Sequence, residues 1–201
     1  MFTRRLILDC AERLLLILLA GPFLYAFAIA LPMHPQFILL AASEAMGVGL
    51  ILIRKPGEIA ATPYAFAIAI LGTALPLYVL PIGATALLPS WVTAIAAFAG
   101  LLVSVSAKLF LNRSFGIVAA NRGIKRNGPY RLVRHPMYLG YIVTQASFLC
   151  AAFSLRNLLI YLFAWTFQVL RIIEEEKMLS RDPEYRMLSA RVRFRLVPGV
   201  Y

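Results

Sequence analysis

The chain has 201 residues, 61% of them hydrophobic, and its mean hydropathy is +0.79. This composition excludes an ordinary soluble domain, because the apolar residues gather in runs close to the ~20 residues that cross a bilayer as a helix. The formal net charge of +11 does not indicate a nucleic-acid partner, because the 20 Lys and Arg residues crowd the ends of the apolar runs and the C-terminal tail. That placement favours membrane lipids with an anionic surface.

The apolar runs predict an all-α fold, a polytopic membrane helix bundle of about six transmembrane helices. With a cytoplasmic N-terminus, Arg156 is the only Lys or Arg on the outer side, as the positive-inside rule requires. We therefore expect both termini in the cytoplasm and a single integral membrane domain over residues 1–201, with N-terminal spans in 1–111 and a cofactor-binding catalytic core in 112–201. The expected spans are residues 12–31, 36–53, 63–85, 90–111, 136–153 and 155–173.

Polar, small and proline residues within the spans give three further predictions. Glu44 lies in the middle of the second span, where an ionised carboxylate is costly. We interpret it as a protonated structural residue, with contact to a substrate as the alternative. Pro76 and Pro81 predict that the third span is kinked or ends early. Gly100 and Ser104 are small enough to let the fourth span approach another helix closely.

The densest functional signal is the segment of residues 128–138, which joins a basic loop to the fifth span. Gly128-Pro129 predicts a turn, and Pro136 suits the first turn of a helix. The N–H groups of that first turn have no partner within the helix, so they can receive an anion or a polar ligand. Arg134-His135 would lie at this end of the helix.

The sixth span ends in three consecutive acids, Glu174 to Glu176. Carboxylates oppose the dipole at a helix C-terminus, so we expect the helix to continue to about residue 180. Alternatively, arginines of the loop or a cationic ligand hold these acids, and a solvated charged face is the third interpretation. Gln168, Arg171 and Glu175 share one face of this helix. Residues 183–195 predict a basic amphipathic helix, which is interpreted as an anchor on anionic lipid, as a lid, or as both.

Together these motifs resemble the isoprenylcysteine carboxyl methyltransferase and phospholipid methyltransferase group of integral membrane enzymes, over about residues 100–198. The stretch Asn121-Arg122-Gly123-Ile124 is similar to the bacterial branch, which implies a bacterial inner membrane protein. The resemblance rests on Gly128-Pro129-Tyr130, Arg134-His135-Pro136-Met137-Tyr138, Arg171 with Glu174-Glu175, Tyr185, Arg191-Val192 and Arg195-Leu196-Val197-Pro198.

The resemblance implies S-adenosylmethionine as methyl donor and S-adenosylhomocysteine as product, with no metal. The cofactor is expected between the loop, the last two spans and the C-terminal helix, and Arg171 is expected to bind the substrate's carboxylate. A carboxylate acceptor needs no general base, whereas an amine or phenol would need one, and Glu174 and His135 are the candidates. The implied cofactor contacts are Ile124, Lys125, Tyr130, His135, Pro136, Met137, Tyr138 and Glu175.

The predicted function is methyl transfer to a lipophilic acceptor at the cytosolic membrane face, with carboxyl O-methylation of an isoprenylcysteine-like substrate preferred. The alternative within this family is N-, O- or S-methylation of a phospholipid amine, a lipidic phenol or a small thiol. The alternative of another class is a non-catalytic membrane scaffold or a small transporter. The polar cluster at one membrane face disfavours a transporter, whose site would lie near the midplane. The acceptor and the oligomeric state stay open.

Overall fold

The computed structural model describes residues 38–60, 62–80 and 83–200, together with isolated positions before residue 38. The predicted first span therefore lies outside the described residues, as does the side chain of Glu44. Within the described residues, short 3-10 helices cover Leu75–Tyr78, Asn112–Ser114 and Gly128–Arg131. The other elements are α2 (Ile38–Leu52), β1 (Glu58–Ile59), α3 (Pro63–Ala74), α4 (Ser90–Leu111), β2 (Ala120–Asn121), α5 (Pro136–Ala151), α6 (Leu155–Leu179) and α7 (Pro183–Arg191).

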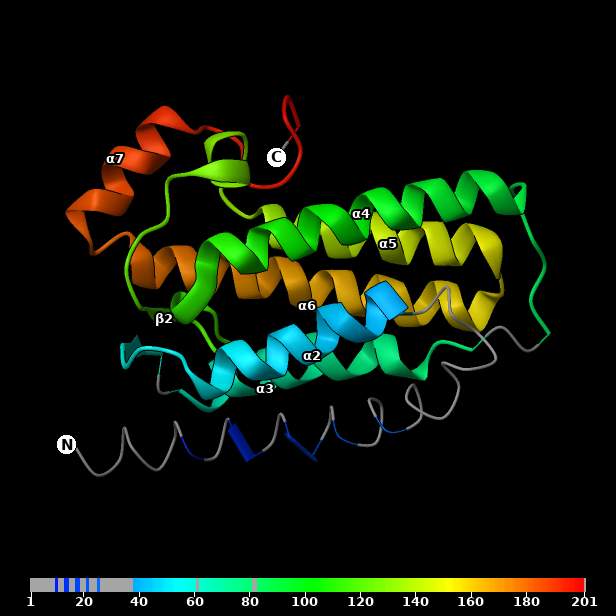
Figure 1. The fold of residues 1–201 in the computed structure, drawn as a ribbon, viewed down its shortest axis with the longest axis horizontal. Coiled ribbons are helices and arrows are strands. Elements are labelled where there is room, and N and C mark those ends of the chain that lie inside the picture. The colour runs from blue at the N-terminus through cyan, green and yellow to red at the C-terminus, as the bar shows by residue number, and fades with distance from the viewer. Residues whose placement is uncertain are drawn as a thin grey trace.

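The long helices lie roughly along one direction (Figure 1). α4 packs on α5 along its length, and α3 packs on α6. α7 and β2 lie at the same end of this bundle, on the left of the view, and we call it the polar end. There β1 and β2 pair antiparallel, which brings Glu58 opposite Asn121. The chain thus gathers its polar segments at one end of the apolar helices.

Two helices in the described part of the chain are long and apolar enough to cross a membrane. They are Ser90–Ser114, with a mean hydropathy of 2.0, and Leu155–Leu179, with 1.2. The shorter apolar stretch Pro63–Tyr78 falls below the length of a full span. The prediction of a mostly helical protein with apolar membrane helices is confirmed, and the number of six spans stays a prediction.

Local sequence signals explain several of the helix boundaries. Thr62, Ser154 and Asp182 each accept a hydrogen bond from a backbone N–H in the first turn of α3, α6 and α7, as N-cap residues do. α3 ends at Ala74, and the 3-10 turn that follows contains Pro76, which cannot continue the α-helical hydrogen bonds. The predicted early end of the third span is confirmed.

The predicted end of the last helix is wrong, because α7 stops at Arg191 rather than at residue 195. The backbone beyond it turns extended and pairs with the start of α5. Arg134 N donates to Phe194 O at 3.0 Å and His135 N donates to Arg195 O at 2.8 Å. These two bonds need an extended tail, so the tertiary contact overrides the helical pattern.

The contact between α4 and α5 is as close as the small residues predicted. A Cβ added to Gly140 would lie 2.6 Å from Gly100 O and 2.5 Å from Ser104 N. Real Cβ atoms do not approach so closely, so only glycine fits at this position. This contact fixes α5 against α4 and thereby sets where α5 begins.

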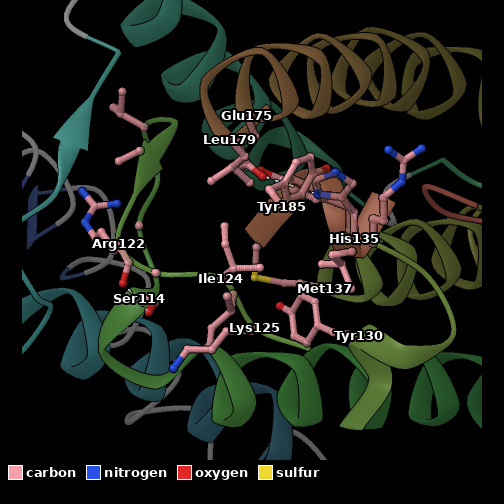
Figure 2. Close-up of a pocket in the computed structure, with 18 residues that line it drawn as sticks. Ser114, Arg122, Ile124, Lys125, Tyr130, His135, Met137, Glu175, Leu179 and Tyr185 are labelled. Atoms are coloured by element: carbon pink, nitrogen blue, oxygen red, sulfur yellow. Dashed lines mark hydrogen bonds and ion pairs between the residues drawn. The ribbon is translucent and has the colours of Figure 1, made fainter. Parts of the chain in front are cut away.

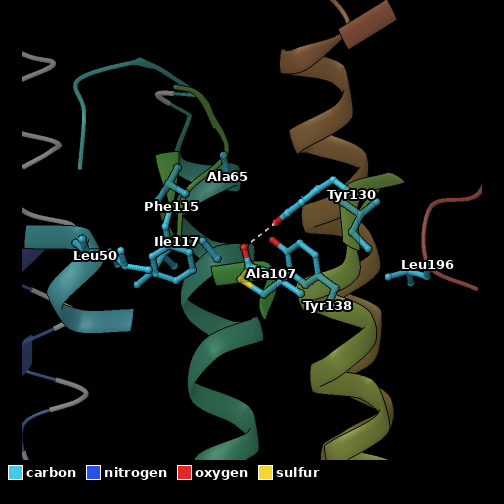
Figure 3. Close-up of a cluster of buried hydrophobic side chains, with 13 residues drawn as sticks. Leu50, Ala65, Ala107, Phe115, Ile117, Tyr130, Tyr138 and Leu196 are labelled. Atoms are coloured by element: carbon cyan, nitrogen blue, oxygen red, sulfur yellow. Dashed lines mark hydrogen bonds between the residues drawn. The ribbon is translucent and has the colours of Figure 1, made fainter. Parts of the chain in front are cut away.

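Buried apolar side chains form one core cluster that reaches from α2 to the C-terminal tail (Figure 3). Leu50 lies at one side of this cluster and Leu196 at the other. Between them, the Tyr130 hydroxyl donates to Ala107 O at 3.5 Å. The loop before α5 is therefore attached to α4 as well as to α5.

Candidate cofactor-binding and active site

A pocket opens at the polar end between the loop after α4, the start of α5, the end of α6, and α7 (Figure 2). Glu175, Tyr185 and His135 lie together on one side of it, and Lys125 and Tyr130 lie on another. The empty space measures about 730 Å³ when its open mouth is included. Its lining includes the predicted cofactor contacts Ile124, Lys125, Tyr130, His135, Met137, Tyr138 and Glu175.

Three predicted site residues do not line this pocket. Pro136 is fully buried in the first turn of α5. Glu174 forms an ion pair with Lys177 at 3.6 Å, and the Lys177 side chain is largely exposed. The Arg171 side chain, on α6, is buried. Its guanidinium donates to Ile117 O at 2.8 Å and to Thr73 Oγ1 at 3.3 Å.

Tyr138 connects Arg171 to the pocket. The Tyr138 hydroxyl donates to Glu175, and the Arg171 guanidinium lies 5.3 Å from the centre of the Tyr138 ring. The Arg171 Nε atom is buried and has no hydrogen-bond partner among the described residues. A buried guanidinium with an unused N–H can donate a hydrogen bond to a further, anionic partner.

His135 lies between two carboxylates. Its Nδ1 atom is 3.5 Å from Glu175 Oε2, and its Nε2 atom is 3.2 Å from Glu176 Oε1. Burial alone lowers the pKa of this imidazole, but the hydrogen bonds to Glu175 and Glu176 outweigh burial and raise the pKa above its ordinary value. The arrangement favours imidazolium, because both ring nitrogens then donate. A protonated His135 is a poor general base and a good partner for an anion.

Glu176 was not predicted as a site residue, yet it joins four segments of the chain. Its Oε1 atom accepts from Arg134 at 3.0 Å, from His135 at 3.2 Å and from the Tyr185 hydroxyl at 3.0 Å. Its Oε2 atom accepts from Arg195 Nε at 2.7 Å. Glu176 thus ties the start of α5, α7 and the tail to α6.

Helical spacing could have identified this residue. The buried polar positions of α6 include Gln168 and Arg171, and Ile172 is buried beside them. Glu176 follows Ile172 by four residues and so falls on the same inward stripe. Leu179 follows Glu175 by four residues, and it lines the pocket for the same reason.

α7 and the loop cover the pocket and are held to each other. Tyr185 and Leu188 form a buried cluster with Val192, against which Ile124 of the loop and Leu179 of α6 pack. Polar contacts reinforce this closure, since Asn121 Nδ2 donates to Asp182 Oδ2 at 2.9 Å and Arg126 pairs with Glu184 at 3.2 Å. The lid interpretation of the last helix is the one that this packing favours.

The raised pKa of His135 leads to a pH prediction. A group whose pKa is raised on folding stabilises the fold fully below its unfolded value of 6.5, and this stability is lost as pH rises through the folded pKa. Each unit by which folding raises the pKa of His135 adds about 1.4 kcal/mol to the free energy of unfolding at low pH. We expect the gap in unfolding temperature between wild type and His135→Gln to be large at about pH 6 and to shrink toward about pH 9. Thermal unfolding in detergent measures this gap, and a gap that stays constant across that range contradicts the prediction.

The chain has apolar helices with a pocket at one end, and its family match gives its class, a membrane methyltransferase that depends on S-adenosylmethionine. More specifically, residues 87–181 match the isoprenylcysteine carboxyl methyltransferase (ICMT) family. That segment contains α4, the loop, α5 and α6, and members of the family are membrane-embedded and use S-adenosylmethionine. A comparison with curated proteins found no match. The predicted resemblance and the prediction of an enzyme are confirmed.

Proposed function

We propose that the pocket binds S-adenosylmethionine and that the protein methylates the carboxylate of a lipophilic, isoprenylcysteine-like acceptor at the cytosolic membrane face. One observation carries this proposal: every predicted cofactor contact except Pro136 lines a single pocket, although these residues come from the loop, α5 and α6. The family match supports both the methyl donor and the class of acceptor. The apolar helices support an acceptor that arrives through the bilayer.

The side chains of the pocket fit a ligand that carries a positive charge, a carboxylate and a flat ring. Glu175 offers a carboxylate to the cationic groups. Arg134 and a protonated His135 are paired with Glu175 and Glu176, and their positive charge still makes this side of the pocket favourable for the ligand's carboxylate. Tyr130 and Ile124 offer an aromatic and an apolar surface to the ring. This set of groups agrees with the chemistry of S-adenosylmethionine.

When bound, S-adenosylmethionine supplies a methyl group on a positively charged sulfur, so the transferred carbon is already activated. The protein then has to align the acceptor and exclude water, and positioning of this kind supplies up to about 7–11 kcal/mol of the barrier in favourable cases. α7 and the loop pack against each other beside the pocket, and a ligand that fills the pocket would displace water and so strengthen its interactions with Glu175.

We assign Arg171 to the acceptor. A guanidinium binds a carboxylate through two parallel hydrogen bonds, and the buried Nε of Arg171 has no other partner among the described residues. A carboxylate acceptor is ionised at neutral pH and needs no base, which agrees with a protonated His135. Glu174, outside the pocket and paired with Lys177, would serve as the base only for an amine or phenol acceptor.

The test separates cofactor binding from acceptor turnover. We expect His135→Ala and Glu175→Gln each to weaken S-adenosylhomocysteine binding by about tenfold or more, because the first removes a positive charge that also holds Glu175 in place and the second removes the carboxylate that faces the ligand's cationic group. Arg171→Lys should leave that affinity within about twofold and lower kcat/KM for the acceptor, because lysine cannot make the paired contact. Calorimetry measures the first quantity, and transfer of labelled methyl to a prenylcysteine analogue measures the second.

Three results would each overturn part of the proposal. If folded wild-type protein does not bind S-adenosylhomocysteine, the protein acts as a scaffold or transporter rather than through this pocket. If the labelled methyl group goes to phospholipid amines and not to the prenylcysteine analogue, the family's other acceptors replace the carboxylate. Wild-type affinity in His135→Ala and Glu175→Gln would remove the assignment of the pocket to the cofactor.

A further inference from the structure

A second hollow lies on the outer face of α7, between that helix and the Gly128–Arg131 turn. We call it the arginine groove, because Arg126, Arg131 and Arg191 line it and none of its lining residues is acidic. Arg126 is already paired with Glu184 at 3.2 Å. Arg131 and Arg191 are both exposed, and neither forms an ion pair with an acid in the part of the chain that the structure describes.

The groove is also apolar along part of its lining. Leu132 is 72% exposed and Met187 is 59% exposed, one on each side of the groove. Large apolar side chains that stand out beside arginines are typical of a surface that lies in a membrane interface, where the apolar groups enter the lipid and the cations meet the headgroups. A soluble anion such as phosphate would use the arginines and leave these two side chains without a partner.

We infer that the arginine groove binds the headgroup of an anionic phospholipid of the inner leaflet, with its phosphate between Arg131 and Arg191. The charge of the whole chain agrees with this occupant, since a net charge of +11 at the ends of apolar helices complements an anionic leaflet. The occupant is a lipid of the bilayer, distinct from any methyl acceptor in the pocket.

The groove shares a wall with the proposed cofactor pocket. Leu188 of α7 lines both, and it packs in the same buried cluster as Tyr185 and Val192. A lipid that bridges Arg131 and Arg191 would hold α7 against the turn before α5 and so keep the pocket covered. This coupling rests on the proposed function, whereas the lipid site itself does not.

The lipid site is tested with the full chain in a nonionic detergent, titrated calorimetrically with a soluble short-chain phosphatidylglycerol. We expect binding that Arg131→Gln and Arg191→Gln each weaken by about fivefold, as the loss of one arginine near an anionic lipid predicts. The matched control is Arg193→Gln, which removes an exposed charge from the same tail but lies outside the groove. Its affinity should equal that of wild type.

Three results would overturn the site. Equal weakening by Arg193→Gln means general attraction to the basic tail. Equal binding of the matching phosphatidylcholine means that the headgroup charge does not matter. Equal binding of inorganic phosphate means a soluble anion rather than a lipid.

The coupling is tested in nanodiscs of phosphatidylcholine with and without phosphatidylglycerol. We expect phosphatidylglycerol to raise the affinity of the wild type for S-adenosylhomocysteine, and Arg191→Gln to lose this increase. The same affinity in both lipids overturns the coupling. No S-adenosylhomocysteine binding in either lipid overturns the proposed function, and the phosphatidylglycerol titration still decides the groove.

Discussion

Glu176→Gln should destabilise the protein by about 3–5 kcal/mol, the usual cost of removing one member of a buried charged network. Glutamine keeps the size of the side chain but removes the charge that Arg134, His135 and Arg195 share. The Glu176 side chain is only 11% exposed and Arg134 only 13%, so water compensates these two groups poorly for the lost charge. Its loss releases α7 and the tail from α6, so binding of S-adenosylhomocysteine should weaken as well.

Unfolding in mixed micelles of sodium dodecyl sulfate measures this loss. Glu184→Gln is the control, because Glu184 is an acid about half exposed whose pair with Arg126 should contribute at most about 1 kcal/mol. A cycle with Arg195→Gln separates one contact from the rest, and we expect a coupling of at least about 1 kcal/mol between Glu176 and Arg195. A Glu176→Gln protein as stable as Glu184→Gln would show that this network does not hold the polar end together.

The helices were predictable because long apolar runs favour helices whatever they pack against, and α4 and α6 have the length that a bilayer requires. The predicted helix starts at Pro136 and Pro183 are confirmed for a similarly local reason, since proline fits only the first turn. The family resemblance pointed to His135, Met137, Tyr138 and Glu175, and these residues line one pocket, whereas their contact with a cofactor stays a prediction. These features depend on residues that are close together in the sequence, so they can be predicted without knowing which distant residues they contact.

Other features depend on partners far along the chain. From the sequence, Lys108 is one of the positive charges expected at the inner ends of the spans. In the structure it is 1% exposed, and its ammonium donates to Ser43 O at 2.9 Å and to Ser43 Oγ at 3.0 Å. The ring of Tyr141 lies 5.3 Å from the same ammonium. These partners come from α2 and α5, and no pattern near Lys108 indicates them. The central role of Glu176 depends in the same way on Arg195, whose position follows from the extended tail.

Gly140→Ala should destabilise the protein by about 1–3 kcal/mol, as overpacking does in a closely packed interface. A Cβ there would meet Gly100 O at 2.6 Å and Ser104 N at 2.5 Å, and both are backbone atoms, which cannot rotate away as a side chain can. α5 would have to move off α4. Because α5 begins at Pro136, directly after His135, the movement should also displace His135 from Glu176 and weaken S-adenosylhomocysteine binding.

Gly49→Ala is the matched control for this substitution. Gly49 also lies within a helix, α2, but a Cβ there meets no heavy atom of the described residues within 4 Å. Alanine has the higher helix propensity, so Gly49→Ala should leave the unfolding temperature unchanged or raise it, with a gain of about 0.4–1 kcal/mol. Opposite signs for the two substitutions would attribute the loss in Gly140→Ala to the α4–α5 contact. A neutral Gly140→Ala would mean that the two helices can separate without cost, and that their contact does not determine where the site begins.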